Sequence, residues 1–104
     1  MKKNALTPEE KIIKALEKNL CEAWYKYCMW EHYVTLVSER NRDKAYGLSR
    51  LSYDDYRTYN TLVRVFATAK VKFPQEKLDE EQRKAEQDAE TMFKHEYKGR
   101  RYDS

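Results

Sequence analysis

The fold of this chain is decided by residues 20–37, which read LCEAWYKYCMWEHYVTLV. At about 100° per residue around a helix, the apolar side chains of this stretch leave no wide polar arc. A helix that is apolar on every side must be covered on every side. The rest of a 104-residue chain offers two further helices, so we expect a second copy or another protein to cover the remainder.

The composition indicates one small all-α domain. Hydrophobic residues make up 40% of the chain and charged residues 38%, where about a quarter is typical, so the core must be concentrated in a few stretches. Only two glycines and two prolines occur, which leaves little turn chemistry for a fold of many short strands. We therefore expect residues 1–104 to form a single helical domain, with 1–6 and 99–104 as frayed tails.

Three helices are predicted, and together they form a three-helix bundle. The first extends over about 8–40, because Thr7-Pro8-Glu9-Glu10 combines an N-cap, a proline at the first helical position and a capping box. Its apolar residues recur at alternating spacings of three and four, which is the heptad seam of a coiled coil. The seam consists of Ile13, Leu16, Leu20, Ala23, Tyr27, Trp30, Val34 and Val37.

The second helix is expected over about 53–73, after a polar loop at 41–51 and with Ser52 as its N-cap. The third is expected over about 75–97, packed through small residues in its middle and stopped by Gly99. Pro74, between them, either reverses the chain or bends it into a hairpin of two long arms. We favour the reversal, because connections between the helices of a bundle are short.

The sequence predicts no enzyme, no cofactor, no metal site and no small-molecule substrate. Phosphate-binding loops need several glycines at fixed spacing, which two isolated glycines cannot supply. Cys28 and His32 share a helix face and could ligate a metal ion or act as a nucleophile with its base, but their spacing brings no third group. We interpret them as a buried thiol beside a half-exposed histidine. Cys21 and Cys28, about 10 Å apart along the helix, are expected to be free.

Nothing in the sequence predicts contact with a membrane. No run approaches the roughly 18 apolar residues that span a bilayer. Lys2 and Lys3 are followed by polar residues where a secretory signal would need an apolar stretch. We therefore expect a cytoplasmic protein.

The aromatic residues of the first helix are the predicted protein interface. Three aromatic residues of the second helix are expected to pack on Tyr27 and Trp30 of the first, namely Tyr59, Phe66 and Phe73. This leaves the other side of the first helix for a partner. Tryptophan and tyrosine dominate binding energy at interfaces, and a contiguous exposed apolar patch is unusual on a monomer. The sequence therefore predicts an adaptor or regulator that forms a homodimer, or binds another protein, through Trp24, Tyr25, Met29, Trp30, Tyr33 and Leu36.

The charge distribution supports an alternative function. Segment 40–72 holds eight basic and three acidic residues, a net of five positive charges, whereas segment 75–97 holds eight acidic and four basic residues. The two segments could neutralise each other. Alternatively, the chain is a small nucleic-acid-binding regulator that contacts phosphates and base edges through Arg50, Arg57, Asn60 and Arg64. The acidic third helix argues against this, since it would repel a phosphate backbone.

Overall fold

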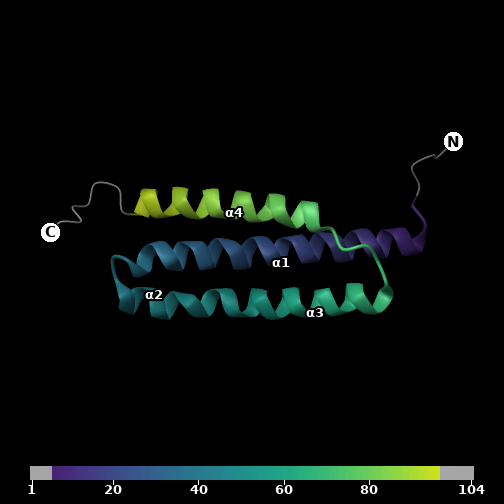
Figure 1. The fold of residues 1–104 in the computed structure, drawn as a ribbon, viewed down its shortest axis with the longest axis horizontal. Helices are drawn as coiled ribbons and strands as arrows, with labels where there is room; N and C mark the ends of the chain where they lie inside the picture. The colour runs from purple at the N-terminus through teal and green to yellow at the C-terminus, as the bar shows by residue number, and fades with distance from the viewer. Residues whose placement is uncertain (1–5, 97–104) are drawn as a thin grey trace.

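The computed structural model describes residues 6–96, and all of their regular structure is helical (Figure 1). Helix α1 spans Pro8–Ser38, α2 Arg42–Leu48, the 3₁₀ helix η1 Ser49–Ser52, α3 Tyr53–Ala69 and α4 Gln75–Glu96. This confirms the predicted all-α three-helix bundle, with α2, η1 and α3 forming its second member. The predicted tails, the end of the third helix at residue 97 and the stop at Gly99 lie outside the described residues, except that Leu6 is included.

Helix α1 begins where its N-terminal sequence predicts. The Thr7 side chain accepts a hydrogen bond from the Glu10 amide at 3.1 Å, and the Thr7 amide donates to the Glu10 carboxylate at 2.9 Å. This reciprocal capping box satisfies two donors that the first turn would otherwise leave unpaired. The helix ends at Ser38, two residues before the predicted end, where the amides of Arg40 and Asn41 both donate to the Val37 carbonyl at 2.8 Å.

The prediction of a loop at 41–51 is wrong, because residues 42–52 are helical. The Asn41 side chain accepts from the Lys44 amide at 3.0 Å and starts α2. Ala45, only 4% exposed, packs into the core beside α1. Gly47 causes no break, since glycine disfavours a helix by only about 1 kcal/mol and the burial of neighbouring residues offsets this cost.

Ser52 does not cap α3 as predicted. Its backbone is itself helical (φ −86°, ψ −12°), and its hydroxyl donates to the Glu31 carboxylate on α1 at 2.7 Å. The residues flanking η1, Leu48 and Tyr53, also have right-handed helical dihedral angles. Segment 42–69 is therefore one continuous helical rod (Figure 1).

Helix α3 ends at Ala69 rather than at the predicted residue 73. Lys70 adopts the left-handed conformation (φ 57°), and the Val71 amide donates to the Phe66 carbonyl at 3.1 Å. Phe73 lies in the connection and packs edge-on against Phe66, with ring centroids 6.0 Å apart. The chain reverses here, so that α4 runs antiparallel to α3 (Figure 1), which confirms the favoured alternative.

The three members of the bundle form an open layer with α1 in the middle. Helix α4 flanks α1 on one side and the α2–η1–α3 rod flanks it on the other (Figure 1). No α-carbon of α3 lies within 8 Å of one in α4, although both approach α1 this closely. The molecule measures 17 Å along its shortest axis. Neighbouring helices therefore cover α1 on two sides and leave it more open on the other two.

The core is divided into two clusters along α1. Near the connection between α3 and α4, Leu20 packs with Phe66 and Leu78, and all three are at most 2% exposed. At the other end, Tyr33 and Val37 pack with two small residues, Ala45 of α2 and Ala89 of α4. Ala85 and Ala89 are fully buried, which confirms that α4 packs through small residues.

Candidate functional site

The structure brings three of the six predicted interface residues together. Met29, Trp30 and Tyr33 belong to the cluster around Val37, and Tyr33 is only 6% exposed. The Tyr33 ring lies edge-on to Trp30 at 6.0 Å and to Phe93 of α4 at 6.5 Å between centroids. The premise that the chain's own helices leave this side of α1 uncovered is therefore wrong for Tyr33, because α4 packs over it.

Trp24 lies in the other cluster. Its ring centroid is 4.6 Å from that of Tyr59 on α3 and 5.6 Å from that of Tyr27. Tyr27 in turn lies 4.9 Å from Tyr56. Helix α3 therefore covers part of the aromatic surface of α1, through Tyr59 and Tyr56, and Trp24 and Tyr27 remain half-buried rather than enclosed.

Tyr25 and Leu36 are half-buried and belong to neither core cluster of the described residues. The Tyr25 hydroxyl donates to the Asp88 carboxylate of α4. That hydrogen bond, together with burial, raises the pKa of Tyr25 to about 12. With Met29, these residues form a row on one side of α1, because positions 25, 29 and 36 lie within about 40° of one another.

The Cys28 and His32 pair does not have the features of an activated nucleophile. Burial, together with the nearby carboxylates of Glu86 and Glu31, raises the pKa of the Cys28 thiol to about 12. His32 Nε2 lies 3.1 Å from a Glu90 carboxylate oxygen on α4. Both cysteines are free, and residues 6–96 contain no group of three or more side chains arranged to hold a metal ion.

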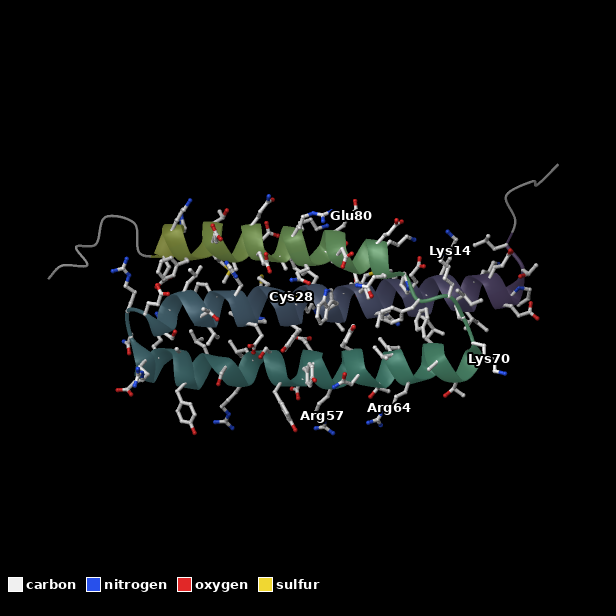
Figure 2. The ribbon with its side chains drawn as sticks, viewed as in Figure 1. Lys14, Cys28, Arg57, Arg64, Lys70 and Glu80 are labelled. Carbon is white, nitrogen blue, oxygen red and sulfur yellow. The ribbon has the colours of Figure 1, made fainter. Side chains whose placement is uncertain are left out.

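The basic residues of the alternative function lie along the α2–η1–α3 rod. Arg57 and Arg64 project from the side of α3 that faces away from α1 (Figure 2). Arg50 is also exposed, whereas Asn60 is half-buried. Within the described part of the chain, no carboxylate lies within 4.0 Å of any of the three guanidinium groups.

The acidic helix does not lie next to the basic part of α3. Helix α4 packs on the opposite side of α1 (Figure 1), and Lys44 pairs with Glu96 at 3.8 Å only at the end where α2 meets α4. The expected mutual neutralisation therefore does not include Arg57 and Arg64. The same separation weakens the argument that α4 would repel a polyanion bound to the rod.

Sequence reasoning missed three exposed tyrosines on the rod. Tyr46, Tyr53 and Tyr56 are 82%, 59% and 41% exposed, and Leu51 of η1 is 46% exposed. The sequence feature that could have revealed this exposed row is the recurrence of tyrosine and arginine at spacings of three and four from residue 46 onward. That signal is hidden when 41–51 is interpreted as a loop, because a loop has no defined face.

No protein-family model, curated protein or solved structure matches this chain. Within residues 6–96, no helix combines the length and the apolar character that crossing a membrane requires.

Proposed function

We propose that this is a small non-enzymatic cytoplasmic protein that acts as an adaptor or regulator by protein–protein association, and that it dimerises through α1. The observation that carries the proposal is the half-exposure of aromatic and aliphatic side chains on a helix that has neighbours on only two sides. Burying such surface between copies is favourable by about 25 cal/mol per Å².

The row formed by Tyr25, Met29 and Leu36 is the preferred contact. Leu36 belongs to neither core cluster, so a partner is the simplest source of further burial for it. Charged residues surround a hollow beside Tyr25, namely Glu22, Lys26, Glu81 and Lys84. Such rim charges set orientation and specificity more than affinity.

The state of the thiols argues against a cysteine nucleophile. A cysteine nucleophile needs a lowered pKa, whereas burial raises the pKa of both Cys21 and Cys28. Their more economical role is that of small apolar residues between α1 and its neighbours.

The proposal is tested by light scattering after gel filtration, with two variants of adjacent residues. Leu36→Lys places a charge in the proposed contact, whereas Thr35→Lys places the same charge at an exposed position on another side of α1. We expect a dimeric wild type, a dimeric Thr35→Lys variant and a monomeric Leu36→Lys variant, all with the same helical circular dichroism. Equal masses for the two folded variants would exclude this row as the dimer contact.

A further inference from the structure

A row of tyrosines and arginines lies along the outer side of the α2–η1–α3 rod. We call the following residues the Tyr–Arg edge: Tyr46, Arg50, Tyr53, Arg57 and Arg64. From Arg50 onward, spacings of three, four and seven residues keep four of them near one side of the rod, whereas the 3₁₀ turn of η1, at about 120° per residue, places Tyr46 roughly a quarter turn away from that side. Arg57 and Arg64 point away from α1 (Figure 2), which places this part of the edge on the side of the rod opposite the core.

The side chains of the Tyr–Arg edge are available for binding. Tyr46 is 82% exposed and Tyr53 is 59% exposed. The guanidinium carbon of Arg57 lies 5.7 Å from the centroid of the Tyr53 ring, a cation–π arrangement, and Arg57 is itself exposed. The arginines have no carboxylate partner among the described residues.

We infer that the Tyr–Arg edge binds single-stranded nucleic acid, a function beyond the protein association proposed above. Single strands are bound by cationic tracks that follow the phosphates, interleaved with aromatic rings on which bases stack. The edge supplies both groups, with tyrosine and arginine alternating from Tyr46 to Arg57 and a further arginine at position 64. The net charge of segment 40–72, five positive, attracts a polyanion to it.

The spacing of the tyrosines favours a single strand over a duplex. Seven residues separate Tyr46 from Tyr53, or about 12 Å along the rod, whereas bases in a duplex strand are stacked about 3.4 Å apart. The two rings therefore contact separate, unstacked bases. An acidic protein would pair with the arginines but would give no role to a Tyr46 ring that is almost fully in solvent.

Fluorescence anisotropy of a labelled oligothymidylate tests the inference, with a duplex of the same length and polyglutamate as competitors. We expect binding at low salt that weakens as salt rises, and competition from either polyanion at least roughly ten-fold weaker than from unlabelled oligothymidylate. No binding at low salt would overturn the inference. Equal competition by the duplex or by polyglutamate would also overturn it, since the edge would then recognise charge alone.

Substitutions separate stacking from charge. Tyr53→Ala is expected to weaken binding roughly ten-fold, and Tyr53→Phe, which keeps the ring, to bind like the wild type. Arg57→Ala is expected to weaken binding and to reduce the salt-dependence slope by about 0.7. The matched control is Arg83→Ala, which removes the same charge from the exposed surface of α4 and is expected to leave affinity unchanged.

Two results from these variants would contradict the inference. One is an unchanged affinity for folded Tyr53→Ala, and the other is an equal loss for Arg57→Ala and Arg83→Ala. Circular dichroism establishes that each variant is folded. The dimer contact is tested separately by Leu36→Lys, so a failure of either proposal is recognised independently of the other.

Discussion

The close approach of α4 to α1 makes Ala89 a sensitive position for a larger side chain. Ala89 is fully buried against Tyr33, Val37 and Ala45, so Ala89→Leu inserts three carbon atoms where no space is left. Overpacking of this kind costs about 1–3 kcal/mol, because the helices must separate or the side chains must leave their preferred rotamers. We expect the free energy of unfolding to fall by about 2 kcal/mol.

Urea denaturation followed by circular dichroism measures this loss. For a chain of this size m is about 1 kcal/mol per molar urea, so the midpoint of the Ala89→Leu variant falls by about 2 M at unchanged m. The control is Ala15→Leu, the same substitution at an exposed position of α1, which is expected to change stability by less than about 0.5 kcal/mol. Equal midpoints for the two variants would refute the close packing of α4 against α1.

Four further predictions concern the backbone, the thiols and pH. Gly47→Ala is expected to stabilise the protein by about 0.5–1 kcal/mol in thermal unfolding, because a Cβ at this helical position meets no atom within 4 Å; destabilisation would show that α2 is not helical there. Lys70→Gly is expected to gain up to about 1 kcal/mol in the same assay, since φ is 57° at this position, and a loss would contradict the left-handed conformation. Cys28 is expected to resist iodoacetamide at neutral pH until the protein unfolds, because burial holds its pKa at about 12; rapid alkylation of the folded state would show an exposed thiolate. The pKa of Tyr25 is about 12 in the folded state and about 10 in the free side chain, so the stability that its hydrogen bond supplies is present below pH 10 and is lost between pH 10 and pH 12. We expect this alkaline loss of stability to be about 1 kcal/mol smaller in Tyr25→Phe, which has no hydroxyl to titrate. Identical alkaline profiles for the two proteins would show that the hydrogen bond to Asp88 is absent.

Those parts of the fold that depend on local chemistry could be predicted from the sequence. The capping box at Thr7 and Glu10 acts within one turn, so the start of α1 is visible in the sequence alone. Helix α2 offers only the Asn41 cap as a local signal, and the burial of Ala45 against α1, which holds its polar sequence in place, is not visible in the sequence. The apolar periodicity also continued to Phe73, past the actual end of α3, because a side chain in a connection can pack on the core without being helical.

The candidate site was predictable only in part for a related reason. The angular positions of Tyr25, Met29, Tyr33 and Leu36 follow from helix geometry. The side of α1 on which α4 packs does not, because an apolar surface all round a helix offers no preferred face. The packing of the Phe93 ring of α4 on Tyr33 becomes apparent only in the folded arrangement, and so does the separation of Arg57 from the acidic helix.

The central claim, that this protein works by association through α1, is tested most directly by equilibrium sedimentation of the wild type over a range of micromolar concentrations. The account predicts a mass of twice 12.6 kDa that falls toward 12.6 kDa on dilution. A mass of 12.6 kDa at every concentration would contradict it.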